Sequence, residues 1–314
     1  MKHRLLAGSL FVVVVLAGCS DRQPASPEAG APSLQRHATQ EQGDPAVLAR
    51  MHEINAQLAV RGSNLFLNEV TAITIGQGRP ANRLLQQQLR WVPNDPRRNA
   101  AGDNITYLVD LSDGATTSGL TAAQTDAAID AALNTWNTTV SCSKVNIAEN
   151  PDGGADPDIF DSFFGFGAFG NPFLADITEA GWLPGAFFDA VFGPGGADGV
   201  LAFSVSFIFV GGGGVPTDIN NDQYFDTALN EVYYNDNFGS PGPRAANPWS
   251  INAPLPAIDV QTVGLHENGH SLSSGHFGPP PTAVMNPVYA GIRQALLPID
   301  KTAHCAFYAS WPNP

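Results

Sequence analysis

Apolar residues recur at helical spacing in several stretches of the chain, since steps of three and four residues return to the same side of a helix. This pattern predicts amphipathic helices whose apolar faces pack on a core. Two of them start at residue types that cap helix N-termini, Thr121 and Asp259, and the last one starts at Asp300. The predicted helices cover residues 46–60, 121–137, 184–192, 259–274 and the stretch after residue 300.

Runs rich in β-branched and aromatic residues separate these helices and predict strands. The run at 201–210, LAFSVSFIFV, has so few polar residues that its strand should be well buried. The predicted strands are 65–75, 105–111, 143–148, 174–178, 201–210 and 229–235. A length of 314 residues allows one large domain or a domain with an extension.

Residues 151–199 have a composition of their own, dominated by Phe, Gly and Pro. Such a stretch is either a low-complexity linker or a loop that packs on the core. The packed loop is favoured, because a linker would expose many phenylalanine side chains and invite aggregation.

The densest chemistry lies at residues 266–276, which read HENGHSLSSGH. On a helix, His266 and His270 are one turn apart and project from the same face, where two imidazoles can bind one Zn²⁺. His276 supplies a third nitrogen beyond the helix, and three protein ligands leave the fourth position to water, as in catalytic zinc sites. Glu267 would act as the general base that takes the proton of that water.

This stretch resembles the zinc motif of the metzincin peptidases, H-E-x-x-H-x-x-G-x-x-H followed by a Met-turn. Downstream, residues 283–289 (AVMNPVY) resemble the Met-turn of the matrixin branch. The resemblance implies that Met285 underlies the zinc site. It also implies that Pro287 and Tyr289 help to wall the pocket that selects the substrate side chain.

The resemblance extends over residues 101–314 and implies an α+β fold. In this fold a twisted, mostly parallel sheet carries an active-site helix, a Met-turn and a C-terminal helix. It further implies a zinc endopeptidase whose polypeptide substrate lies extended along a sheet edge. Residues 46–100 then form an N-terminal extension, either a removable propeptide or a structural cover. Matrixin latency uses a propeptide cysteine, and none lies between Cys19 and Cys142.

One position departs from the family pattern. The glycine that lets the helix break is Ser273 in this chain, and Gly275 follows two residues later. Gly275 is the expected site of the left-handed turn, because glycine has no Cβ to clash there.

Two other interpretations of the motif stay open. A metzincin-like scaffold can serve as a catalytically silent binding module, which is typically marked by loss of the glutamate, yet Glu267 is present. A purely structural zinc would need a fourth protein ligand, for which Tyr289 is the candidate.

An acidic loop further upstream resembles an EF-hand calcium loop. Oxygen-bearing side chains stand at its positions 1, 3, 5 and 9, namely Asp218, Asn220, Asp222 and Asp226. The loop lacks the glycine of position 6, where Gln223 stands, and the glutamate of position 12, where Leu229 stands. The alternatives are a Ca²⁺ site and an acidic turn that leads into a strand.

The N-terminus predicts export. A basic start is followed by a short apolar run over residues 5–17, which is typical of a signal peptide and too short for a membrane span. The run ends in Leu-Ala-Gly-Cys, which resembles a bacterial lipobox and implies cleavage before Cys19 and its acylation; the alternative is a plain signal peptide. Residues 1–18 are thus the signal, and residues 19–45 a disordered tether. Ser20 in place of Asp indicates sorting to the outer membrane.

Charge and the remaining cysteines narrow the expected partners. A formal charge of −14 argues against nucleic acid and anionic lipid headgroups, so membrane attachment should rest on the lipid alone. A monomer is expected. In an exported chain Cys142 and Cys305 predict one disulfide, with two buried free thiols as the alternative.

Overall fold

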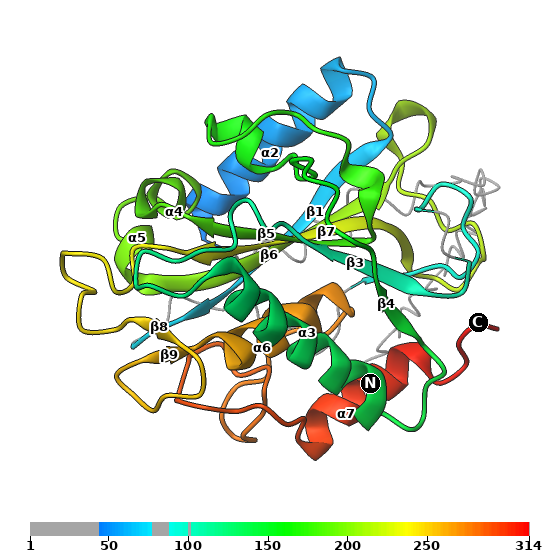
Figure 1. Cartoon of the computed structure of the whole chain (residues 1–314). Coiled ribbons are helices and arrows are strands. Elements are labelled where there is room, and N and C mark those ends of the chain that lie inside the picture. The colour runs from blue at the N-terminus through cyan, green and yellow to red at the C-terminus, as the bar shows by residue number, and fades with distance from the viewer. Residues whose placement is uncertain (1–43, 77–87, 100–101, 314) are drawn as a thin grey trace, which may run out of the picture. The chain divides into compact units, whose positions relative to one another are not determined.

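A seven-stranded mixed sheet, most of whose neighbours run parallel, organises the protein (Figure 1). The computed structural model describes residues 44–76, 88–99 and 102–313, all within one compact unit. The strand order is β1-β6-β7-β5-β3-β4, and β2 pairs with β7. The strands are β1 (Leu65–Thr74), β2 (Leu89–Arg90), β3 (Ile105–Val109), β4 (Ile147–Glu149), β5 (Ile177–Leu183), β6 (Val200–Phe209) and β7 (Phe225–Asn235), with a separate pair β8 (Trp249–Ser250) and β9 (Ile258–Asp259).

Helices cover both faces of this sheet (Figure 1). On one side lie α3 (Ala122–Thr139), α6 (Val260–Ser271) and α7 (Pro298–Tyr308), and on the other α2 (Pro45–Val60), α4 (Gly185–Phe192) and α5 (Gly196–Gly199). Three 3₁₀ turns complete the elements: η1 (Asp161–Phe164), η2 (Pro172–Leu174) and η3 (Gly212–Gly214). Two large apolar clusters follow this division, since one contains the core residues of α3 and α6 and the other those of α2 and α4.

Of the seven strands, only β6 runs opposite to the others. β4, β3, β5 and β7 are parallel neighbours, while β6 pairs antiparallel with β7 and β1 pairs antiparallel with β6. The predicted α+β class with a mostly parallel sheet is therefore confirmed.

Most predicted elements are present, with shifted ends. β5 was expected at residues 174–178 but starts at Ile177 and continues to Leu183. It continues through a bulge at Gly181, whose φ of +93° only glycine adopts readily, so a residue that usually ends strands lies inside one.

The Phe/Gly-rich segment packs on the sheet, as predicted. Phe187 and Phe188 of α4 are fully buried. The ring of Phe203 in β6 lies 5.7 Å from that of Phe187 and 5.8 Å from that of Phe160, centroid to centroid. Most of the phenylalanines thus build the second apolar cluster, while Phe169 is exposed.

The predicted extension, residues 46–100, contributes a strand to the sheet. β1 belongs to the predicted extension, yet it pairs with β6 along its whole length, from Leu65 opposite Phe209 to Thr74 opposite Val200. The extension therefore provides the outermost strand of the sheet.

The predictions for the cysteines and for the N-terminal segment have different outcomes. The Cys142–Cys305 disulfide is present and ties the loop after α3 to α7. Cys19, the signal peptide and nearly all of the expected tether lie outside the described residues. Among the residues that are described, no helix has the length and apolarity needed to cross a membrane.

Removal of the disulfide should destabilise the fold markedly. The bridge joins residues separated by 163 positions, so a Cys142→Ala/Cys305→Ala variant should lose about 3–5 kcal/mol of unfolding free energy in the chain-entropy model. Urea unfolding followed by tryptophan fluorescence measures the loss, and the wild type under a phosphine reductant is the control. Equal midpoints for the oxidised wild type and the variant would contradict the expectation.

Candidate metal centre

Helix α6 positions the zinc motif and is buried on all sides. Its N-cap is Asp259, as predicted, and the carboxylate accepts a hydrogen bond from the Thr262 amide at 2.9 Å. Trp136 of α3 donates to the carbonyl of Leu265 at 2.9 Å, and Trp91 donates to that of Ser271 at 2.8 Å. The indoles thus fix the helix from two sides.

The helix ends in a left-handed turn at Ser273, whose φ is +65°. The expectation that Gly275 makes this turn was wrong. For a residue other than glycine, the left-handed conformation costs roughly 1 kcal/mol of folding free energy. The Ser273 hydroxyl lies 2.8 Å from that of Tyr308 in α7. A buried hydrogen bond of this kind contributes about 1 kcal/mol of stability, which offsets that cost.

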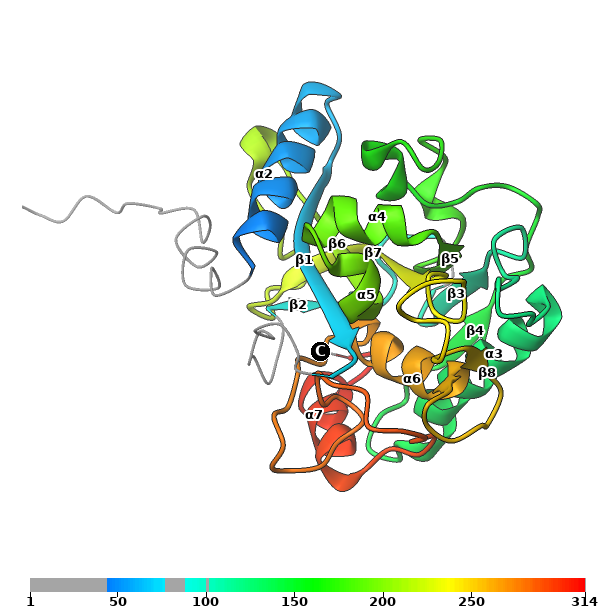
Figure 2. The same cartoon turned by 90° about the vertical axis from the view of Figure 1, so that its left-hand side faces the viewer.

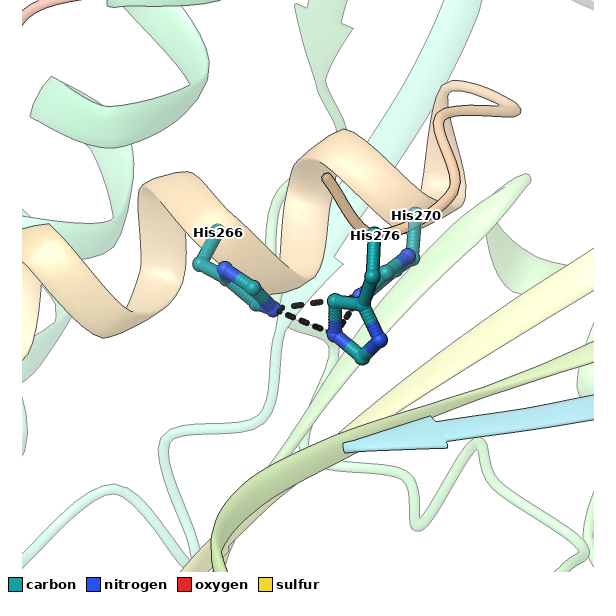
Figure 3. A group of neighbouring side chains, drawn as sticks. All are labelled: His266, His270 and His276. Carbon is teal, nitrogen blue, oxygen red and sulfur yellow. Dashed lines mark hydrogen bonds between the residues drawn. The ribbon is translucent and has the colours of Figure 1, made fainter. Parts of the chain in front are cut away.

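Three imidazoles meet where the chain returns past the helix (Figure 3). The Nε2 atoms of His266, His270 and His276 form a triangle with all three sides 3.1 Å long. The side chains are 0%, 0% and 3% exposed. Ligands of a tetrahedral zinc at about 2.0–2.1 Å would lie about 3.3 Å apart, so the triangle fits one face of such a site.

In two of these rings, hydrogen bonding places the proton on Nδ1 and leaves Nε2 unprotonated. His266 Nδ1 donates to the carbonyl of Val284 at 2.8 Å, and His270 Nδ1 donates to that of Ser274 at 2.7 Å, since a carbonyl only accepts. Burial lowers the pKa of His266 to about 4 and the pKa of His270 well below its usual range. The neutral rings therefore direct bare Nε2 lone pairs at each other, an arrangement that a metal cation stabilises.

Glu267 lies beside the triad and is fully buried. Its Oε1 accepts a hydrogen bond from the backbone amide of Ile73 at 3.1 Å. Burial raises the pKa of this carboxyl well above its usual range, although the amide of Ile73 acts in the opposite direction. The predicted base is thus positioned against the main chain of β1.

Met285 packs against the triad-bearing helix at Gly269, the residue before His270. A Cβ added at Gly269 would lie 2.2 Å from the Met285 sulfur, so glycine is needed for the close approach. Asp300 holds the turn, because its carboxylate accepts hydrogen bonds from the amides of Val284 at 3.0 Å and Met285 at 3.3 Å. Asp300 was expected to be the N-cap of α7, but the N-cap is Leu297 and Asp300 bonds back to its amide.

The residues after this turn face β1. The carbonyl of Pro287 accepts from the Thr74 amide at 3.0 Å, and the amide of Tyr289 donates to the Thr74 carbonyl at 2.8 Å. The Tyr289 hydroxyl accepts from the Asp259 amide at 2.9 Å. Asp259 precedes His266 by two helical turns, about 10 Å, so Tyr289 does not serve as a fourth ligand.

The predicted calcium loop is stabilised differently. Asp226 forms an ion pair with Arg97 at 2.6 Å, and Asp222 one with Arg90 at 3.3 Å. Asp218 accepts the amides of Asp222 and Gln223 at 3.0 and 2.9 Å, and the Asn220 side chain donates to Asp222 at 3.0 Å. Within the described chain these carboxylates do not gather into an ion-sized group. The loop is an arginine-paired turn that leads into β7.

Sequence reasoning missed a buried carboxylate behind the helix. Glu179 of β5 accepts hydrogen bonds from Asn268 at 2.6 Å and from the Tyr234 hydroxyl at 2.7 Å. Burial raises its pKa to about 7, while both donors act to lower it. A single charged residue inside the apolar run ITEAGWL was the available signal.

No protein-family model matches the chain, and no curated protein matches it. The interpretation of the site therefore depends on its geometry.

Filling the space at Gly269 should weaken the centre. A Gly269→Ala side chain would overlap Met285 and should cost about 1–3 kcal/mol of stability, together with zinc affinity. Thermal unfolding and metal analysis measure both effects. Gly278→Ala is the matched control, because no atom lies within 4 Å of its Cβ position. Equal behaviour of the two variants would show that the contact does not matter.

Proposed function

We propose that this protein is a zinc-dependent endopeptidase of the matrixin-like branch of the metzincins. The observation that carries the proposal is the buried triangle of His266, His270 and His276 with its 3.1 Å sides. Zinc is the preferred occupant of a three-imidazole site with an acidic neighbour, and the geometry fits its tetrahedral coordination.

The surroundings support the same assignment. The helix bears two of the proposed ligands, a left-handed turn leads the chain to the third, and Met285 packs against the helix at Gly269. His266 and His270 each donate a hydrogen bond from Nδ1 to a backbone carbonyl oxygen. This second hydrogen bond orients metal-ligating histidines and raises their basicity.

The residues divide the chemistry between them. Zinc, when bound, supplies a Lewis acid that polarises the substrate carbonyl and acidifies water. Glu267 takes the proton of the attacking water and delivers it to the leaving amine nitrogen. Its Oε1 already lies 3.1 Å from a peptide nitrogen, that of Ile73, which is within the reach required of a general acid or base.

The expected substrate is a polypeptide bound in extended form. Backbone groups of β6 and of residues 287–289 already pair with a strand between them, so main-chain hydrogen bonding supplies affinity with little sequence preference. Pro287 and Tyr289 belong to this boundary, in agreement with their proposed role as a pocket wall.

The setting is proposed from the sequence alone. Acylation at Cys19 would anchor the protein to the cell envelope, with sorting to the outer membrane, and the acidic surface leaves the lipid as the only membrane contact. The protein is proposed to act as a monomer.

Replacing the base should separate metal binding from hydrolysis. Glu267→Gln should keep one zinc per chain and lower the cleavage of a quenched peptide by about 10²–10⁴-fold, since the carboxylate transfers protons and does not ligate the metal. Metal analysis and long fluorescence time courses measure the two properties.

Two controls accompany this variant. Glu53→Gln makes the same change on the exposed face of α2 and should leave hydrolysis unchanged, and His270→Ala should lose the zinc. Hydrolysis by Glu267→Gln at the wild-type rate would remove the proposed mechanism. Zinc binding without hydrolysis in any variant would favour the silent binding module.

A further inference from the structure

The end of β1 lies beside α6, the helix that carries Glu267 and two of the three histidines (Figure 2). β1 is the outermost strand of the sheet, and it contacts the triad-bearing helix. The Ile73 amide donates a hydrogen bond to Oε1 of Glu267 at 3.1 Å. Ile73 itself is 2% exposed and belongs to the large cluster beneath the sheet.

The main chain of this segment is held on both sides. Ile73 is opposite Ala202 in the antiparallel pairing with β6, and Thr74 forms a parallel bridge with Val288. The amide and carbonyl of Thr74 bond to the carbonyl of Pro287 and the amide of Tyr289 at 3.0 and 2.8 Å. Such two-sided pairing is how an added peptide strand is recognised.

Occupation of this slot closes the centre. Glu267 and two of the three histidines have no exposed surface, and His276 has 3%. A second peptide cannot pair with the same edge of β6 while β1 is there, because each strand edge accepts one partner.

We propose that residues 72–74 occupy the position of a bound peptide, so that the chain keeps its own centre closed. This inference rests on the proposed function and assigns its regulation. The register places the Ala72–Ile73 bond at the reacting position, because the nitrogen of Ile73 is the one that faces the proposed proton donor. Opening requires displacement of the end of β1.

The test compares the full-length zinc-loaded chain with two variants that loosen this end. Ile73→Asp places a carboxylate in the large apolar cluster, and Thr74→Pro removes the amide that bonds to Pro287. Both should raise kcat/KM for a quenched peptide by at least about ten-fold, since only the open fraction binds substrate. Both should also lose zinc faster to dipicolinate. Val60→Asp, the same kind of change at an 88% exposed site on the extension, should match the wild type.

The two readouts separate this inference from the proposed function. Equal hydrolysis and equal zinc loss for wild type and variants, with melting transitions retained, would overturn the closure and leave the peptidase. Faster zinc loss without hydrolysis in any variant would support the closure and overturn the peptidase. If Ile73→Asp does not fold, Thr74→Pro decides, because it leaves the buried isoleucine in place.

A different cluster, at the C-terminal end of β3, supports a second inference. Asp110, Asp156 and Asp158 bring carboxylate oxygens within 4.8 Å of one another. Asp110 and Asp158 are 1% and 2% exposed, and each has an oxygen without a hydrogen-bond partner. Asp161, 4% exposed, also has one such oxygen.

Among the described residues, the ion pairs found all lie elsewhere, and none involves these four carboxylates. Burial, followed by the negative charge of Glu231, raises the pKa of Asp158 far above its usual range. Buried carboxylates of like charge are stable as anions only with a cation between them.

We infer that Asp110, Asp156 and Asp158 bind a divalent cation of the calcium type, for which clustered carboxylate oxygens are the preferred ligands. The ion would tie the end of β3 to the Phe-rich segment. It is separate from the arginine-paired loop at residues 218–226.

Calcium titration of the purified chain tests this site. Isothermal titration should show binding, with a rise in melting temperature, and Asp158→Asn should weaken it by about ten-fold or more. Asp126→Asn, in the more exposed group with Asp130 and Glu149, is the matched control and should bind like the wild type. Absence of calcium binding by the wild type, or equal loss in both variants, would overturn the site. If Asp158→Asn does not fold, Asp156→Asn, at an exposed position, replaces it.

Discussion

The burial of three imidazoles in mutual contact is the constraint on which the rest of the molecule depends. His266 and His270 commit their Nδ1 protons to the carbonyls of Val284 and Ser274, so their Nε2 atoms face each other as acceptors. Without a cation this arrangement is unfavourable in a site with no exposed surface. The fold must therefore hold the three rings together against their own repulsion, and a cation at this position would relieve it.

The supports for this arrangement come from distant parts of the sequence. Trp136 and Trp91 bond to the carbonyls on either side of the helical turn that carries His266 and His270. Asp300 holds the turn that contains Met285. The disulfide fixes α7, which supplies Asp300, to the end of α3, which supplies Trp136. The two indoles and the carboxylate each satisfy a buried backbone atom, so loss of one leaves an unpaired group in the core.

The sequence was informative where the pattern was local. The helical spacing of His266 and His270, the cap at Asp259 and the alternation of strands and helices were all predicted, because they depend on neighbouring residues. The left-handed turn was assigned to Gly275 because its conformational preference is strong, whereas Ser273 adopts it with the help of Tyr308, a tertiary contact. The placement of β1 on β6, and the arginines that neutralise the acidic loop, depend on pairings over more than a hundred residues, which one sequence does not reveal.

The position of β1 also bears on solubility. All ten residues of β6 are buried, and its outer hydrogen-bonding edge is satisfied only by β1. A chain that lost β1 would present a long, apolar strand with unpaired amides and carbonyls, which is a template for pairing between molecules. Exchange of β1 for another extended segment keeps that edge covered, whereas its removal does not. The same strand whose end donates a hydrogen bond to Glu267 thus protects the sheet from self-association, so a change in β1 affects both contacts.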